Sequence, residues 1–569
     1  MPAWVVQPLD EQFVLDLSQF LLLSPLKARL LATRGIGTVE GAVRFLSASK
    51  AHLYDPYLFR EMDVATELLH QAIVGGDRIL VHGDYDADGI CGTALLYEVL
   101  KKLGADVHFF VPDRTRDGYG LARRVMDRGI EVGLKLLISV DCGSSNAEVV
   151  SLLARHGVQV IITDHHETTE RIPDAHAFLN PKLPDETYPF RELAGAGVAF
   201  KLLQGLEKKI GFQLSLENQL DLVALGTLGD YSTLRDENRI LVSLGLEAMR
   251  EWHRPGLQAL RMESNLPAKR FTARQVCFTL VPRLNSPGRM GSARDVVRLL
   301  VTADTTEAPQ IAREIEEKNW RRRMHDNRVT EEACYLADIV LKRVEPSALV
   351  FSSSSWHEGV VGIGAARLAE KYNMPSTLIA VNDGVGKGSA RSAGMVNIKK
   401  VLEWCSEYLI EYGGHKEAGG FSILEENIPD FQRIFEEAVE ELAEGGEGHS
   451  TLNADAETSL EECDIDLISF IERLGPFGPG NHEPVLLVRD LEVVPGSRIV
   501  GEWHLKMRAR NAKGLSRDLI GFSMAKAWNP DVITGKILDV LIHLRRNRYM
   551  GREEPELQII DLRFAGDTT

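Results

Sequence analysis

The sequence predicts an α/β protein in which a parallel-sheet domain is followed by a long connecting helix, a second α/β domain and a small β-barrel. Short apolar strands alternate with amphipathic helices between about residues 63 and 211, which is typical of a parallel sheet covered on both faces. A single helical pattern spans residues 304–343. Beyond residue 448, alternating strands are separated by glycine turns, which favours a barrel.

The composition is that of an ordinary globular protein with several domains. Of 569 residues, 44% are hydrophobic and 26% are charged, and the net charge is −17. This charge does not suggest nucleic-acid binding, although a narrow positive channel can coexist with an acidic exterior. We find no apolar run long enough to span a membrane and no secretion signal. Six cysteines without C-x-x-C spacing fit a reduced cytoplasm.

The chain divides into five predicted parts. Residues 1–60 form a segment of short helices, residues 61–300 the catalytic domain, 301–345 the connecting helix, 346–448 the second α/β domain and 449–569 the barrel. In the catalytic domain we expect strands at 78–81, 107–111, 136–140, 158–163 and 177–179, with helices at 93–103, 121–129, 146–156 and 198–210.

The stretch HGDYDADGI, from His82 to Ile90, carries the strongest chemical signal. Asp84, Asp86 and Asp88 lie on a predicted turn between a buried strand and a helix. Three carboxylates so close together repel one another unless a cation neutralises them. The alternative is an acidic surface loop. It agrees less well with the sequence, because aspartate and histidine residues also follow other predicted strands.

Those residues are of the same chemical type. Asp141 ends one predicted strand, Asp164, His165 and His166 end the next, and Asp230 follows an apolar helical run. Ligands of parallel sheets bind beyond the carboxyl ends of the strands. Carboxylates with imidazole and no thiolate suit Mn²⁺ or Mg²⁺, and two such ions catalyse phosphoester hydrolysis.

The ordered motifs HGDYDADG, VDCGSSN, TDHHE and LGTLGD resemble those of the DHH phosphoesterase superfamily. Within it, the chain resembles the RecJ family of bacterial single-stranded-DNA-specific 5′→3′ exonucleases. The narrower resemblance rests on PDRTRDGYGL (112–121), NPK (180–182), AGAGVAF (194–200), PRLNSPGR (282–289), WHEGVVGI (356–363) and GGHKEAGG (413–420).

The resemblance implies roles for residues around the ions. His82 either ligates metal or orients a neighbour, Asp84 lies near the ions as a catalytic residue, and His166 contacts the scissile phosphate or acts as a hydrogen-bond partner behind the ligands. Cys142 departs from the asparagine that the family often has, which weakens support for Asp141 at that position. The implied metal ligands are Asp86, Asp88, Asp141, His165 and Asp230.

It also implies groups that hold the strand. Arg114 and Tyr119 would hold the 5′ end, with Arg116 as a rival to Arg114. Arg283 and Arg289 are both candidates for neutralising the scissile phosphate, and Arg289 is slightly favoured. Further implied DNA and 5′-phosphate contacts are Ser389, Arg391, His415 and Lys416 in glycine-rich turns of the second domain, and Trp503 and Lys506 in an oligonucleotide-binding (OB) type barrel.

We therefore expect a metal-dependent exonuclease that degrades single-stranded DNA 5′→3′ to mononucleotides in repair and recombination. The resemblance alone suggests single-strand-binding protein and a helicase as partners. We expect a monomer, because the predicted two-lobed site is complete within one chain. A DHH enzyme acting on oligonucleotides or small phosphoesters is one alternative, but such enzymes lack the C-terminal barrel. An inactive single-strand-binding scaffold is another, but the full set of ligands argues against it.

Overall fold

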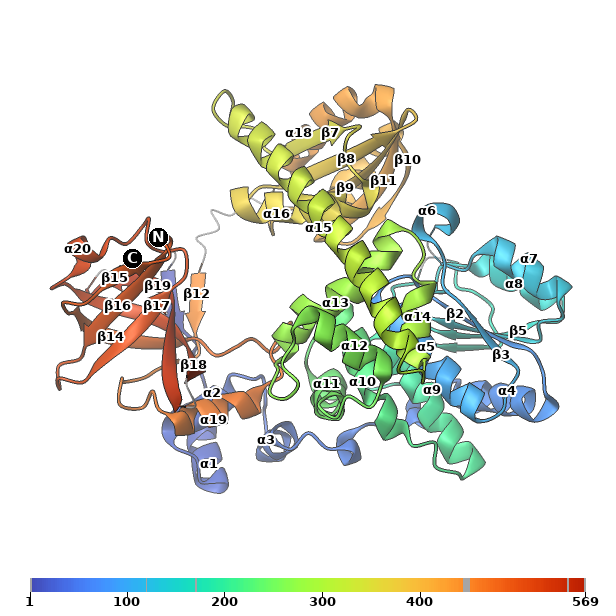
Figure 1. The fold of residues 1–569 in the computed structure, drawn as a ribbon, viewed down its shortest axis with the longest axis horizontal. Helices are drawn as coiled ribbons and strands as arrows, with labels where there is room; N and C mark the ends of the chain where they lie inside the picture. Colours follow the sequence, from blue (N-terminus) through green and yellow to red (C-terminus); the bar gives the residue numbers. More distant parts are fainter. Residues whose placement is uncertain (1–2, 119, 169–170, 444–450, 550–551, 567–569) are drawn as a thin grey trace.

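The protein, seen as a computed structural model, is described for residues 3–118, 120–168, 171–443, 451–549 and 552–566. Figure 1 shows a catalytic body at the lower right, a second lobe above it and a barrel at the left. The long helix α15 (Glu307–Val340) runs diagonally from the catalytic body into the second lobe, as the sequence predicts. Within the described ranges, none of the helices combines the length and apolar character needed to cross a membrane.

The catalytic body is built on a parallel sheet of five strands in the order β3-β2-β4-β5-β6. This confirms the predicted parallel sheet, and the ends of its strands differ from the prediction by at most two residues. The strands are β2 (Ile79–Gly83), β3 (Val107–Phe110), β4 (Leu136–Val140), β5 (Gln159–Thr163) and β6 (Ala177–Leu179).

Both faces of this sheet are covered, because successive strand residues point to opposite sides. Ile79 and Val81 pack into the core formed with α4 (Met62–Gly75), α5 (Ala87–Lys102) and α9 (Gly195–Ile210). Leu80, between them, belongs to a separate core with α7 (Arg123–Glu131) and α8 (Ala147–Arg155). The body is completed by α10 (Leu220–Gly229), α11 (Asp236–Met249), α12 (Pro255–Ser264), α13 (Ala273–Met290) and α14 (Arg294–Val301).

The second lobe has a mixed sheet in the order β10-β11-β9-β8-β7, in which only β7 and β8 are parallel neighbours. Helices α15 and α16 (Glu358–Tyr372) cover one face, and α17 (Ile398–Trp404) and α18 (Ile428–Leu442) cover the other. Its strands are β7 (Leu349–Ser353), β8 (Ser376–Asn382), β9 (Val385–Arg391), β10 (Leu409–Gly414) and β11 (Ala418–Leu424).

The C-terminal sheet has the order β13-β14-β18-β19-β17-β16-β15, and an additional pairing of β14 with β16 closes it into a barrel. The predicted barrel is therefore confirmed, although its hairpin is longer than expected. Its strands are β13 (Ala456–Glu457), β14 (Leu486–Val493), β15 (Arg498–Val500), β16 (His504–Arg510), β17 (Ser516–Gly521), β18 (Ile537–Tyr549) and β19 (Arg552–Phe564).

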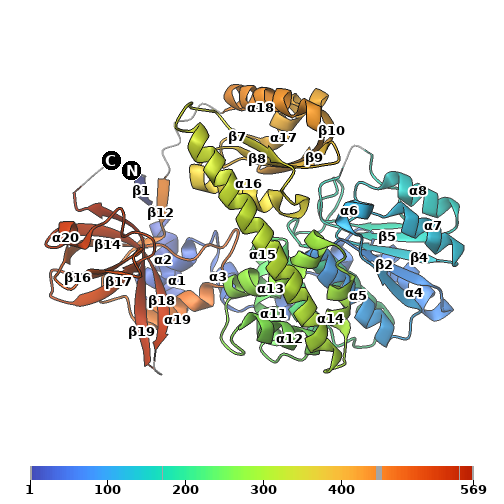
Figure 2. The same ribbon diagram turned by 45° about the horizontal axis from the view of Figure 1, so that its top comes forward.

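The N-terminal segment packs against this barrel (Figure 2). Helices α1 (Glu11–Leu21), α2 (Pro25–Ala32) and α3 (Val39–Leu46) contribute to the same hydrophobic cluster as α19 (Ile465–Leu474). The expectation of helices alone was wrong at the start of the chain. There, β1 (Ala3–Val6) pairs in parallel with β12 (Thr451–Ala454), a partner that lies too far along the chain for a local pattern to reveal it.

Candidate metal centre and nucleic-acid interface

The acidic stretch forms the turn between β2 and the N-terminus of α5. Asp86 caps the helix, since its Oδ1 accepts hydrogen bonds from the backbone N–H groups of Asp88 (3.0 Å) and Gly89 (3.2 Å). Asp84 and Asp88 are buried. A Cβ atom at Gly89 would lie 2.5 Å from the backbone nitrogen of Asp84, so only glycine permits this turn.

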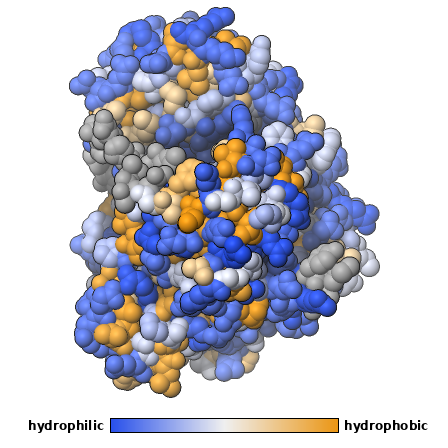
Figure 3. All heavy atoms as spheres, turned by 90° about the vertical axis from the view of Figure 1, so that its left-hand side faces the viewer, coloured by the Kyte–Doolittle hydropathy of each residue, from blue (hydrophilic) through white to orange (hydrophobic). Residues whose placement is uncertain are grey.

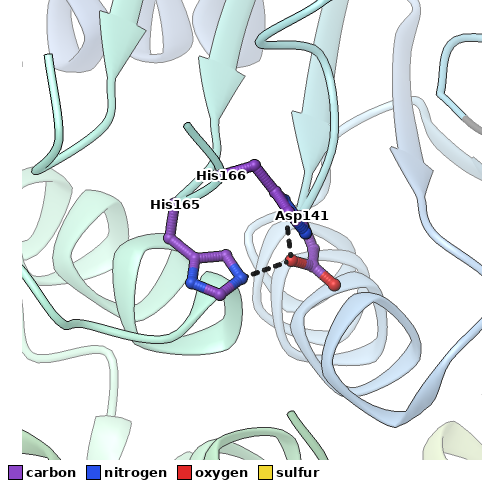
Figure 4. A group of neighbouring side chains, drawn as sticks. All are labelled: Asp141, His165 and His166. Atoms are coloured by element: carbon purple, nitrogen blue, oxygen red, sulfur yellow. Dashed lines mark ion pairs between the residues drawn. The ribbon is translucent and has the colours of Figure 1, made fainter. Parts of the chain in front are cut away.

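Asp141 and His165 reach the same place from the ends of β4 and β5 (Figure 4). The Nε2 atom of His165 lies 3.0 Å from Oδ1 of Asp141 and 3.9 Å from carboxylate oxygens of both Asp88 and Asp230. Asp141 has a φ of 60°, a left-handed conformation that is costly for a non-glycine residue and is typical of functional sites.

Together these side chains form overlapping groups whose ligand atoms lie within 4.8 Å of one another. The groups are Asp84 with Asp86 and Asp141, Asp88 with His165 and Asp230, and Asp141 with His165 and His166. Among the described residues, Oδ1 of Asp84 is buried without a hydrogen-bond partner, and Oδ1 of Asp141 and Nε2 of His165 face each other at 3.0 Å in a geometry that forms no hydrogen bond. Unsatisfied buried ligand atoms that converge on one space fit a bound cation.

The electrostatics of the cluster agree with this interpretation. Burial raises the pKa values of Asp84, Asp88 and Asp141 well above the usual range, and the neighbouring carboxylates raise them further. Asp88 is held in place by the N-terminus of α9, whose N–H groups at Gly195 and Ala196 donate to its oxygens over 2.7 and 2.9 Å. A divalent cation would offset the repulsion that remains.

His82 belongs to none of these groups among the described residues. Its Nε2 accepts a hydrogen bond from the backbone N–H of Ala122 (3.2 Å), and its Nδ1 lies 3.8 Å from Sγ of Cys142. Burial lowers the pKa of His82 to about 4, so the ring is neutral. Both ring nitrogens face neighbouring groups in this arrangement, which fits the orienting role, one of the two roles that the resemblance implies for His82. Cys142 faces His82 in this arrangement.

His166 is oriented by the aspartate that begins its own triplet. Its Nδ1 lies 2.8 Å from Oδ1 of Asp164 and 3.8 Å from Oδ1 of Asp141. Burial alone would lower the pKa of His166, but the hydrogen bond and charge of Asp164 raise it to about 9. The imidazolium lies at the rim of the cluster with 42% of its side chain exposed, where a phosphate oxygen can approach it.

The two arginines of the PRLNSPGR motif have different surroundings. Arg283 is occupied, with its Nε 2.6 Å from Oε2 of Glu316. Arg289 forms a 3.3 Å hydrogen bond to the carbonyl of Gly359, and burial together with the nearby charge of Arg114 lowers its pKa to about 10. The structure thus favours Arg289 for the phosphate, because Arg283 would have to give up its ion pair.

Arg391 faces the catalytic body from the second lobe. Its guanidinium donates to Oγ of Ser389 (2.8 Å) on the same strand, and burial and the charge of Arg114 lower its pKa. Arg114, in the short helix α6 (Arg114–Asp117), lies 5.6 Å from the ring of Tyr85. These basic groups lie near one another, since, in addition to burial, the charge of Arg114 lowers the pKa of both Arg289 and Arg391. On the face drawn in Figure 3, the surface is hollowed below the upper lobe.

The other predicted contacts lie farther out. Tyr119 lies outside the described residues. His415 and Lys416 are exposed on the turn between β10 and β11. Trp503, 64% exposed, and Lys506, whose Nζ lies 3.2 Å from Asp518, belong to the barrel, which is a separate body from the metal cluster (Figure 1).

Three asparagine and serine residues support the site although no role was predicted for them. Asn180 donates to Oγ of Ser144 (3.0 Å) and to the carbonyl of His166 (2.9 Å), and the N–H of Ser144 donates to Asp164. Oδ1 of Asn285 accepts a 2.7 Å hydrogen bond from Ala87. All three lie inside motifs that carried the resemblance, which was the only available signal, because their partners are distant in sequence.

Comparison with protein families matches three domains along the chain. The DHH family N-terminal domain matches residues 78–227, the DHHA1 domain residues 345–441 and the RecJ OB domain residues 454–561.

Full-length relatives agree with these matches. The chain is 34% identical to the single-stranded-DNA-specific exonuclease RecJ of Bacillus subtilis over 98% of its length and 70% of that protein. It is 33% identical to RecJ of Escherichia coli over 90% of its length and 91% of that protein. The crystal structure of Thermus thermophilus RecJ in complex with Mn²⁺ superimposes with a TM-score of 0.84, 30% identity and coverage of 99% of this chain and 79% of that one. The chain belongs to the RecJ family of single-stranded-DNA-specific exonucleases.

Proposed function

We propose that this protein is a metal-dependent exonuclease that hydrolyses single-stranded DNA from the 5′ end and releases mononucleotides. The observation that carries the proposal is the convergence of buried carboxylates and His165 at the strand ends, with Arg114, Arg289 and Arg391 near one another beside them. Mn²⁺ or Mg²⁺, bound as a pair, is the expected cofactor, since related RecJ structures contain these ions.

Asp86, Asp88, Asp141, His165 and Asp230 would hold the ions, and Asp84 lies close enough to assist. When bound, the ions would supply a nucleophilic water and charge stabilisation at the phosphate. Arg289 would bind a phosphate oxygen through its planar fork. His166, cationic beside Asp164, would donate a hydrogen bond to the same phosphate or a proton to the leaving oxygen.

Arg114, Ser389 and Arg391 would receive the 5′ phosphate, and this placement sets the direction of cleavage. Tyr119 and the turn carrying His415 and Lys416 would contact the strand nearby. Trp503 and Lys506 would bind the strand on the barrel. We further propose the five-part division at residues 60, 300, 345 and 448, a cytoplasmic location, a monomeric state, a role in repair and recombination, and contacts with single-strand-binding protein and a helicase.

The test uses single-stranded DNA labelled at its 3′ end, incubated with Mn²⁺, Mg²⁺ or EDTA, beside a blunt duplex. A labelled strand that shortens only when single-stranded and only with metal supports the proposal. Comparing strands that carry a 5′ phosphate with strands that carry a 5′ hydroxyl tests whether Arg114, Ser389 and Arg391 receive the 5′ phosphate. Intact DNA under every condition would contradict the proposal, and short oligonucleotides would then be the next substrates.

A further inference from the structure

A buried arginine joins three segments that are far apart in sequence. Arg239 on α11 is 3% exposed. Its guanidinium donates to the carbonyls of Phe45 (2.6 Å), Gly475 (2.7 Å), Arg473 (3.1 Å) and Leu474 (3.4 Å). It also lies 3.6 Å from the centroid of the Phe45 ring. One side chain on the catalytic body thus holds both the N-terminal helices and the C-terminal unit.

The bonding pattern of Arg239 is unusual for a buried cation. Burial lowers its pKa to about 10, and no carboxylate in the described part of the chain offsets that effect. Its acceptors include the last carbonyls of α19, where the helix dipole places partial negative charge. A buried charge is costly, so it persists only where several hydrogen bonds compensate it. The planar fork of arginine makes four such bonds at once.

The loop that follows α19, residues 475–481, lies on the same part of the catalytic body. The N–H of Leu234 donates to the carbonyl of Pro479 (2.7 Å), and Nε of Arg235 donates to that of Gly480 (2.9 Å). A Cβ atom at Gly478 would lie 2.8 Å from Cδ1 of Leu234, so the backbone of the loop packs closely against the Leu234 side chain. We call residues 234–239 together with 475–481 the junction.

The junction adjoins the metal cluster. Asp230 ends α10, and the chain then passes directly into Leu234 and Arg235. The backbone that carries a proposed metal ligand therefore continues into the surface on which the C-terminal unit rests. A shift of that unit would act on the catalytic body at this point.

We propose that Arg239 is a positioning residue that fixes the C-terminal barrel relative to the metal centre, so that one DNA strand is held by both. This inference rests on the proposed function. Two sites held at a fixed separation bind a long strand more tightly than either does alone, because the second contact is intramolecular. A strand too short to reach the barrel gains nothing from the junction.

The test compares the full-length wild type with Arg239→Ala, Arg239→Lys and Arg270→Ala. Arg270 bridges the same two bodies to Glu553, but over 3.5 Å and with 68% of its side chain exposed, so it serves as the matched control. With Mn²⁺, kcat and KM are measured on 5′-phosphorylated strands of about forty and about five nucleotides, the shorter one lying within a single binding site. Hydrogen exchange at the amide of Leu234 is measured on the same samples.

For Arg239→Ala we expect KM on the long strand to rise about tenfold or more, while kcat on the short strand stays at the wild-type value. Leu234 should exchange faster. Arg239→Lys should have a long-strand KM and a Leu234 exchange rate between those of Arg239→Ala and the wild type, because lysine retains the charge but lacks the planar guanidinium. Arg270→Ala should match the wild type in both measurements.

An unchanged KM on the long strand, or an equal loss of kcat/KM on the long and the short strand, would overturn the inference. If Arg239→Ala does not fold, Arg239→Lys decides by the same criteria. If the wild type cleaves neither strand, the proposed function fails. Unchanged exchange at Leu234 in the two Arg239 variants would refute the junction by itself.

Discussion

Replacing Asp141 by Asn tests whether the buried carboxylates form a cation site. The substitution preserves shape but removes one negative charge from a side chain that is 1% exposed and surrounded by like charges. Without metal, the variant should be at least as stable as the wild type, because repulsion is relieved. Nuclease activity should be lost, because a proposed ligand oxygen is replaced by an amide nitrogen.

The expected size of the effect follows from ligand linkage. A cation at about 100 times its Kd stabilises the native state by about 2.7 kcal/mol. For a domain the size of the catalytic domain, residues 61–300, that stabilisation corresponds to a rise of about 5–10 °C in the Tm of the wild type when Mn²⁺ replaces EDTA. For Asp141→Asn we expect less than half of that rise, measured by thermal unfolding in the two buffers.

Asp221→Asn is the matched control. Asp221 is also buried, but it pairs with Arg254 at 2.9 Å. This variant should unfold at a lower temperature in EDTA, since buried Arg254 loses one of its two carboxylate partners and keeps only Glu98, yet it should keep the full rise with Mn²⁺. The reasoning would be refuted if Asp141→Asn kept the wild-type rise, or if it were as destabilised in EDTA as Asp221→Asn.

Three further predictions concern individual side chains. Lys201→Met should destabilise the protein by about 3–5 kcal/mol in urea unfolding, because it leaves Glu237 buried without the ammonium group that lies 2.6 Å away; a free-energy loss below about 1 kcal/mol would contradict this. Arg289→Ala should lower kcat on single-stranded DNA by about 10²–10³-fold, whereas Arg283→Ala should lower it far less, and the reverse order would exchange their roles. Arg391→Ala should abolish the preference for a 5′-phosphorylated over a 5′-hydroxyl strand in competition assays, and a retained preference would show that another group reads the phosphate.

The sequence predicted the elements well where the pattern is local. The strand containing Leu136 was placed without error, and the long helix was placed within a few residues. Local patterns were insufficient where partners are distant, as in the pairing of β1 with β12.

The basic segment at residues 318–328 illustrates a second limit of prediction from sequence. Residues 318–328 read equally well as a channel lining or a solvated face, and the structure gives several of their side chains carboxylate partners on α15 itself. Arg321 pairs with Glu317, and Arg328 pairs with Glu332. Charge along a sequence does not reveal which cations remain available, because pairing depends on which helix face each residue occupies.

What the sequence determined by itself was the chemistry. The types and order of Asp86, Asp141 and His165 predicted a carboxylate–imidazole metal site, because parallel strands bring their carboxyl ends to one edge of the sheet. Only the tertiary structure revealed that the ring nitrogens of His82 face Ala122 and Cys142 and that Arg283 is already paired. The junction around Arg239 was also revealed by the tertiary structure alone. Its acceptors are backbone carbonyls, which every residue type carries, so the sequence does not indicate which of them the arginine contacts.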